Sequence, residues 1–206
     1  MLTFRKRRGG FTLIELLVVI AIIAVLIALF VLPPLALIVW ILHRLQSPGP
    51  LLFVQTRAGI QNKKFKIIKF RTMDLPKSGM AEENHDPSRI FYAARILRRF
   101  SLDEIPQFIN VIRGEMSVIG PRPHLLEHND KFAQVMKEYH IRSLIKPGIT
   151  GLAQVRGFRG EAKETKDIEA RLQSDIDYIE NWSIALDVTI FFRTIYQMIR
   201  PPDGAR

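Results

Sequence analysis

A long apolar segment near the amino terminus constrains this chain more than any other feature. Residues 11–32 contain a single charge, Glu15, and a second apolar run, residues 35–42, follows Pro33 and Pro34. Twenty-two helical residues at about 1.5 Å each are long enough to cross a bilayer core of about 30 Å. The segment is therefore expected to anchor the chain in a membrane.

Basic residues lie on both sides of this segment, at residues 5–8 before it and at Arg44 and residues 57–66 after it. Positive charge marks the cytoplasmic side of a membrane segment, and proline interrupts the hydrogen bonds of a helix. These facts favour a re-entrant helix hairpin, broken at Pro33 and Pro34, over a straight span. A signal peptide is the alternative, but no small-residue cleavage site follows the apolar run. Residues 1–46 are thus expected to form the anchor, and residues 47–206 a cytoplasmic domain.

The composition narrows the class of protein. The chain has 206 residues and no cysteine, which excludes a disulfide scaffold, a thiolate zinc site and a cysteine nucleophile. Its mean hydropathy of +0.08 is too low for a transporter with many spans. A net charge of +10 points to an anionic partner such as a nucleic acid, a lipid surface or a phosphorylated substrate.

Short strands and amphipathic helices are expected between residues 47 and 206. Hydrophobic patterning predicts strands at residues 51–55 and 65–71 and helices at residues 90–100, 103–114, 161–178 and 184–199. The expected fold class is α+β and mostly helical: the membrane hairpin plus a small catalytic domain with short strands and interfacial amphipathic helices.

The strongest candidate for chemistry is the pair Asp103 and Glu104, at a predicted helix start within residues 100–107. The helix dipole stabilises charged carboxylates there. Carboxylates close to arginines such as Arg98 suit Mg²⁺ and phosphate together, because this cation shares oxygen ligands with substrate phosphates. The alternative is a purely structural capping box between Ser101 and Glu104.

Two basic stretches are further candidates. Arg122 lies between Pro121 and Pro123, which would hold its guanidinium in a rigid turn suited to phosphate, although a plain surface turn is equally compatible. Residues 63–71 interleave Lys and Arg with aromatics, as nucleic-acid-binding segments do and as solvated strands also do. Directly after a membrane anchor, anionic lipid or a lipid phosphate is the more economical partner.

The amino-terminal residues also carry a second, local pattern. Residues 8–15, Arg-Gly-Gly-Phe-Thr-Leu-Ile-Glu, and the apolar residues after them resemble a type IV prepilin leader. The resemblance covers about residues 5–30 and implies cleavage after Gly10. The Gly-, Thr- and Ser-rich β domain of a pilin is not found in the sequence.

A longer series of motifs resembles the bacterial sugar transferase family, the monotopic phosphoglycosyl transferases. These are, in order, Pro34, Ser47-Pro-Gly-Pro50, Phe53-Val-Gln55, Lys69-Phe-Arg-Thr-Met73, Ser101-Leu-Asp-Glu-Ile-Pro-Gln107, Gly114-Glu-Met-Ser-Val-Ile-Gly-Pro-Arg-Pro123, Lys146-Pro-Gly-Ile-Thr-Gly-Leu-Ala-Gln154, Asn181-Trp-Ser183 and Leu186-Asp187. The resemblance covers about residues 31–200. Two further stretches, residues 123–129 and 157–161, are most similar to the undecaprenyl-phosphate glucose phosphotransferase branch. Many relatives in that branch carry extra spans and a further domain, and this chain is expected to be the minimal catalytic unit.

The resemblance implies a specific reaction and site. The chain would transfer a sugar 1-phosphate from a UDP-sugar, with glucose favoured, to undecaprenyl phosphate. Asp103 matches the nucleophile that would form a covalent phosphosugar and release UMP, and Glu104 would hold Mg²⁺. Phosphate-contacting positions match Lys69, Arg98, Arg122 and Arg159. The hairpin at Pro33 and Pro34 would keep this site at the membrane.

The same resemblance sets expectations for location and partners. The chain is expected in the bacterial inner membrane with its catalytic domain on the cytoplasmic face, at the first membrane step of exopolysaccharide or glycoconjugate synthesis. Its expected partners are a UDP-sugar, undecaprenyl phosphate, membrane lipid and a second copy in a homodimer, with no nucleic acid. The alternative is a pilin-like anchored protein whose transferase domain is inactive.

Overall fold

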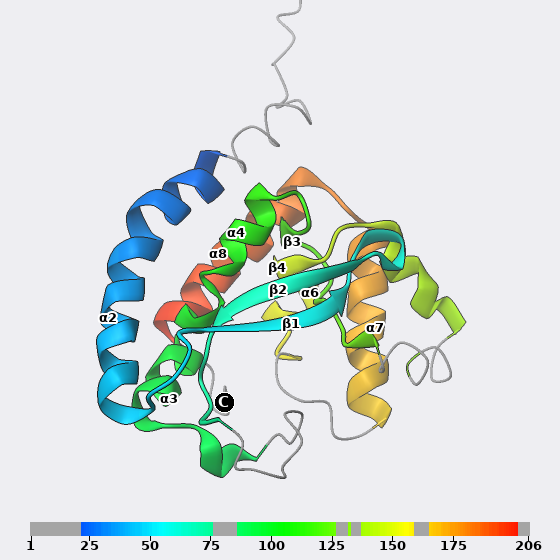
Figure 1. The fold of residues 1–206 in the computed structure, drawn as a ribbon. Coiled ribbons are helices and arrows are strands. Elements are labelled where there is room, and N and C mark those ends of the chain that lie inside the picture. Colours follow the sequence, from blue (N-terminus) through cyan, green and yellow to red (C-terminus); the bar gives the residue numbers. More distant parts are fainter. Residues whose placement is uncertain (1–21, 76–85, 127–131, 133–136, 159–164, 202–206) are drawn as a thin grey trace, which may run out of the picture.

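The computed structural model describes residues 22–75, 86–126, 132, 137–158 and 165–201 (Figure 1). The helices are Leu32–Gln46 (α2), Tyr92–Arg99 (α3), Gln107–Ile112 (α4), Leu152–Val155 (α6), Thr165–Glu180 (α7) and Ile184–Ile199 (α8). The strands are Leu52–Ala58 (β1), Lys64–Phe70 (β2), Ser117–Ile119 (β3) and Gly148–Thr150 (β4). Short helical turns span Ile60–Asn62, Pro87–Arg89, Leu102–Glu104 and Lys137–Leu144. The expected fold class, mostly helical with short strands, is confirmed.

The strands form two separate two-stranded sheets. β1 and β2 pair antiparallel, with Leu52 opposite Phe70 and Ala58 opposite Lys64, so the two predicted strands are confirmed. β3 and β4 pair in parallel, and this pairing was not expected. Each of these strands is only three residues long and lies in a Gly- and Pro-rich stretch, which the sequence pattern marks as a turn.

Backbone segments approach very closely beside β3 and β4. Gly120 N donates to Thr150 O at 2.8 Å, and Gly148 N donates to Pro121 O at 2.9 Å. A Cβ atom on Gly148 would lie 2.2 Å from Gly120 N, a distance that no side chain tolerates. Glycine is therefore required at position 148 so that the segment holding Arg122 can lie against β4.

The apolar segment forms one helix from Ile22 to Gln46, and it is not interrupted at Pro33 and Pro34. A wider, π-helical turn over Ile27–Val31 precedes the prolines, and Leu32 N donates to Ile27 O. Because proline lacks an N–H and its ring crowds the carbonyl four residues earlier, this wider turn gives the room that the pair needs. The expected break is thus replaced by a continuous helix that curves along its length (Figure 1).

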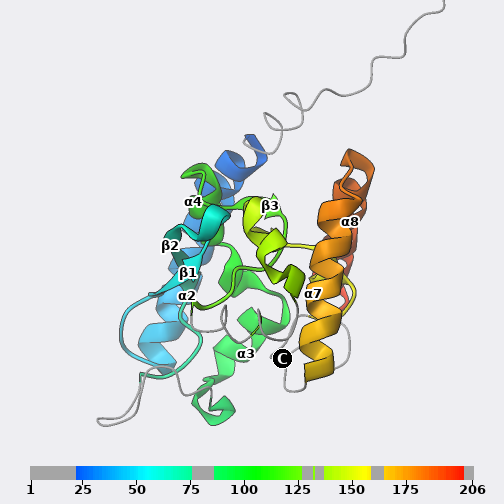
Figure 2. The same ribbon diagram turned by 90° about the vertical axis from the view of Figure 1, so that its right-hand side faces the viewer.

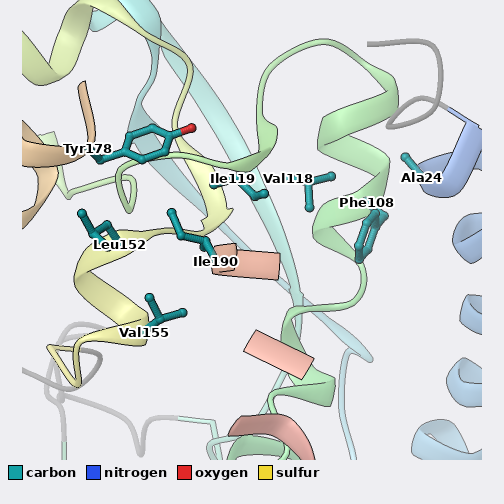
Figure 3. Close-up of a cluster of buried hydrophobic side chains, with 8 residues drawn as sticks. All are labelled: Ala24, Phe108, Val118, Ile119, Leu152, Val155, Tyr178 and Ile190. Carbon is teal, nitrogen blue, oxygen red and sulfur yellow. The ribbon is translucent and has the colours of Figure 1, made fainter. Parts of the chain in front are cut away.

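Both ends of this helix pack on the rest of the molecule. Ala24 is fully buried in the main hydrophobic cluster with Phe108 of α4 (Figure 3). Further along, Val39 is fully buried with Phe70 and Leu97. Of the described residues, only this helix is long and apolar enough to cross a membrane, by length and composition alone.

α8 matches its predicted residues 184–199, and α7 overlaps the predicted 161–178, of which residues 161–164 lie outside the described residues. α7 buries Leu172 and Ile176, and α8 buries Ile190 in the main cluster. The buried Asp187 accepts hydrogen bonds from Tyr178 Oη at 2.8 Å and Trp182 Nε1 at 3.2 Å, which ties the start of α8 to the end of α7. α7 and the curved α2 helix lie on opposite flanks of the molecule (Figure 2).

Candidate active site

The two candidate carboxylates lie on a tight helical turn, Leu102–Glu104, rather than at a helix cap. Ser101 precedes the turn with a left-handed φ of 57°, and its side chain makes no capping bond. Glu104 N and Ile105 N donate to carbonyls three residues earlier, and α4 begins only after Pro106. Proline has no N–H for a longer-range helical bond, so a short 3₁₀ turn fits this position. The helix predicted from residue 103 therefore begins later, at Gln107, and the capping box between Ser101 and Glu104 is not formed.

Glu104 is held between two cations from different parts of the chain. Lys69 Nζ from β2 lies 2.8 Å from Glu104 Oε1, and Arg122 donates to the same oxygen at 2.9 Å and to Oε2 at 3.5 Å. The Glu104 side chain is 9% exposed. Its charge in turn raises the pKa of Arg122. Glu104 is therefore a buried carboxylate that is paired with two cations.

Asp103 is buried beside Glu104 and has a perturbed acidity. Burial first, and then the negative charge of Glu104, raise the pKa of the Asp103 carboxyl to about 6. The positive charges of Lys69, Arg98 and Arg122 act in the opposite direction. A carboxyl group whose pKa is shifted toward neutral pH, at a site rich in cations, is typical of reactive groups.

The backbone of Arg122 is fixed by a buried network that sequence patterns did not predict. Arg142 donates from Nη2 to Arg122 O at 2.7 Å and from Nε to Asp175 Oδ2 at 2.8 Å. Its Nη1 lies 2.8 Å from His124 Nδ1, which also contacts Tyr139 Oη at 3.1 Å. Because β3 leads directly into residues 120–123, the network and the strand together aim Arg122 at Glu104.

The structure brings together most of the predicted site residues. Asp103, Glu104, Lys69 and Arg122 are in contact or adjacent, and Arg98 acts on Asp103 through its charge. Arg159 lies outside the described residues and remains a prediction. Arg57 of β1 is a residue that sequence reasoning missed, because the predicted strand ended at Gln55. A longer strand would have placed Arg57 on the same face as Lys69.

The site has few side chains that could coordinate a metal ion. Within the described ranges, no group of three or more His, Cys, Asp or Glu side chains could hold a metal. At this site Asp103 and Glu104 offer carboxylate oxygens, which are hard donors. Such a pair fits Mg²⁺, which binds through one or two carboxylates and takes its other ligands from water and substrate phosphates.

A buried carboxylate pair flanked by Lys and Arg thus lies on a small, mostly helical domain that also has a long apolar amino-terminal helix. The chain belongs to the bacterial sugar transferase family, whose model matches residues 15–201. It is 41% identical over 178 residues to a protein of Escherichia coli (strain K12) named UDP-glucose:undecaprenyl-phosphate glucose-1-phosphate transferase. A protein of Caulobacter vibrioides with the same name is 43% identical over 178 residues.

A third relative carries a different sugar in its name. The UDP-N-acetylgalactosamine-undecaprenyl-phosphate N-acetylgalactosaminephosphotransferase of Aeromonas hydrophila is 39% identical over 176 residues. These three matches cover 84–85% of this chain but only 38%, 66% and 41% of the respective relatives. The chain thus spans between about two fifths and two thirds of the length of these relatives.

Proposed function

We propose that this chain transfers a sugar 1-phosphate from a UDP-sugar to undecaprenyl phosphate. The observation that carries the proposal is the buried Asp103 beside a Glu104 that is paired with Lys69 and Arg122. Membership of the sugar transferase family and the names of the relatives support the substrate class. The chain would therefore be a phosphoglycosyl transferase.

The proposed reaction has two displacements at phosphorus. In the first, a carboxylate oxygen of Asp103 attacks the β-phosphorus of the UDP-sugar, and the bond to the bridging oxygen breaks. UMP leaves with that bonding pair, and the sugar phosphate stays on Asp103 as an acyl phosphate. In the second, a phosphate oxygen of undecaprenyl phosphate attacks the same phosphorus. The acyl phosphate bond breaks, the lipid diphosphate sugar forms, and the Asp103 carboxylate is restored.

The cations around Asp103 have separate roles in this reaction. Lys69 and Arg122 neutralise Glu104 and would turn toward phosphate oxygens when substrate binds. Arg98, whose charge already acts on Asp103, would stabilise the developing charge in the transition state. Glu104 would hold Mg²⁺, which neutralises a diphosphate when it is bound.

The curved helix is proposed to lie in one leaflet of the membrane. Ala24 near one end of the helix and Val39 toward the other both pack on the same domain. A helix that ran straight across the bilayer would lose one of these two contacts. The opposite face of the helix exposes large apolar side chains: Leu29, Phe30, Leu37, Ile38, Trp40, Ile41 and Leu45. An apolar surface of this kind is suited to lipid. The helix would thus enter and leave the cytoplasmic leaflet of the inner membrane as a re-entrant segment.

The proposed pathway and donor follow from the relatives. Glucose is the favoured sugar, because two of the three relatives described above are named for it, and an N-acetylated sugar is the next candidate. The reaction would start an exopolysaccharide or glycoconjugate on its lipid carrier. The homodimer and the cleavage after Gly10 stay predictions.

The proposal is tested by release of UMP from the full chain held in lipid nanodiscs. The protein receives Mg²⁺, undecaprenyl phosphate and, in separate reactions, UDP-glucose, UDP-galactose, UDP-N-acetylglucosamine or UDP-N-acetylgalactosamine. We expect UMP with UDP-glucose and no UMP from Asp103→Asn. A folded wild-type protein that releases no UMP with any donor would contradict the proposed function.

A further inference from the structure

Arg57 lies on the same face of the β1–β2 hairpin as the active-site lysine. Lys69 is directly opposite Phe53, and Arg57 is directly opposite Phe65. Residues that face each other in an antiparallel pair point to the same side, and side chains along a strand alternate. Arg57 is therefore on the side of the hairpin from which Lys69 reaches Glu104.

The hydrogen bonds of Arg57 leave its charge uncompensated. Its Nη2 donates to Gln55 Oε1 at 2.6 Å, and that acceptor is neutral. Its Nε is buried and has no hydrogen-bond partner, and the described part of the chain gives Arg57 no carboxylate within ion-pair distance. Arg57 is half-buried, and a cation that is partly removed from water without a paired carboxylate costs free energy.

The neighbours of Arg57 increase this cost rather than relieve it. Burial first, and then the positive charge of Arg122, lower the pKa of Arg57 to about 10, and only Glu104 acts in the opposite direction. Glu104 is already paired with Lys69 and Arg122. The site thus holds more positive charge than its own carboxylates balance, and an anion from outside the protein would supply the difference.

We propose that Arg57 binds a phosphate group of a substrate, beside Arg122, and is a further substrate-binding residue of this site. A planar guanidinium whose Nε–H has no partner is suited to donate hydrogen bonds to the oxygens of a phosphate. The inference rests on the proposed transfer reaction. The phosphate belongs either to the diphosphate of the sugar nucleotide or to the lipid acceptor, and separate kinetic constants distinguish them.

The test compares Arg57→Gln with a matched control on the same hairpin. Lys66→Gln removes the same charge from an exposed residue of β2 that is opposite Thr56 and faces away from Arg57. For each full-length protein in nanodiscs, the KM for UDP-glucose and the KM for undecaprenyl phosphate are measured separately by UMP release. We expect Arg57→Gln to raise one KM by roughly 10- to 100-fold, since a charge-assisted hydrogen bond is lost. The control should match the wild type in both.

Two further measurements separate binding from structure. The unfolding midpoint of ligand-free Arg57→Gln should be no lower than that of the wild type, because a half-buried charge without a paired carboxylate is removed. Equilibrium binding of UDP-glucose and of undecaprenyl phosphate, each measured without turnover, should weaken for the ligand whose KM rises. Arg57→Lys keeps the charge but not the planar donors, and it should fall between the wild type and Arg57→Gln.

The outcomes distinguish this inference from the proposed function. Unchanged KM and binding for both ligands in Arg57→Gln, beside an active wild type, would overturn the role of Arg57. A lowered midpoint with a loss confined to kcat would also overturn it, because it would indicate packing rather than binding. An inactive wild type that still binds a ligand more tightly than Arg57→Gln would overturn the reaction and support the phosphate site.

Discussion

The surroundings of Asp103 control the protonation state of its carboxyl group. Burial and the neighbouring Glu104 raise its pKa to about 6, while Lys69, Arg98 and Arg122 limit the rise. In the proposed reaction the carboxylate form of Asp103 is the nucleophile, and a raised pKa means that this form is lost at a higher pH than in an ordinary aspartate.

This acidity predicts the pH dependence of the first displacement. The kcat/KM for UDP-glucose should fall as the pH drops through about 6 and should level off above it, because that ratio reports the free enzyme. Replacing Arg98 by Gln removes a charge that lowers this pKa, so its profile should shift to higher pH. A wild-type profile that is flat between about pH 5 and 8 would contradict the role given to Asp103.

The residues of the site could be predicted from the sequence to different degrees. Asp103, Glu104 and Arg122 lie in short, distinctive motifs, and the structure brings them together. Arg57 and Arg142 lie in stretches without such a signal. Their placement depends on strand register and on contacts with distant residues such as Asp175, 33 positions away from Arg142, which local patterns do not contain.

Among the elements, the β3–β4 pair has the strictest steric requirement. It joins residues 117–119 to residues 148–150 and leads directly into the segment that holds Arg122. The backbones are so close that Gly148 has no room for a Cβ. The geometry of the active site therefore depends on a pairing of only three residues per strand.

Gly148→Ala is expected to destabilise the fold by about 3 kcal/mol, because the new Cβ would overlap backbone that cannot move aside. The matched control is Gly157→Ala. Gly157 has a φ of +101°, but a Cβ added there would meet nothing within 4 Å, so its cost should be about 1 kcal/mol. Denaturant unfolding in detergent measures both. Equal losses in the two variants would show that close packing at Gly148 is not the controlling factor.

Helices were more predictable than strands for a physical reason. The apolar spacing in α7 and α8 is a local property of consecutive turns, and α8 matches its predicted range of residues 184–199. The hairpin strands were also recovered, although the first was predicted to end at Gln55 and extends to Ala58. β3 and β4 are too short to show any period, and the tight turn before α4 depends on the backbone of Ser101.

At the scale of the whole molecule, the apolar surface is unevenly distributed. The curved helix exposes its outer apolar face, and α8 exposes Phe192, Tyr196 and Ile199 while burying Ile190. The sequence predicted an apolar anchor with prolines at its centre. It did not predict the π-helical turn that precedes the prolines and lets the helix continue through them.

Whether Asp103 carries the sugar phosphate is measured in the absence of the lipid acceptor. The full chain in nanodiscs receives UDP-glucose and Mg²⁺ alone, and both UMP and the intact mass of the protein are measured. We expect about one UMP per active protein. We also expect the protein mass to increase by one hexose phosphate, located at Asp103. Undecaprenyl phosphate should then remove the added mass, and Asp103→Asn should show neither change. UMP that forms only when the lipid is present, with an unchanged protein mass at every time, would contradict a covalent intermediate on Asp103.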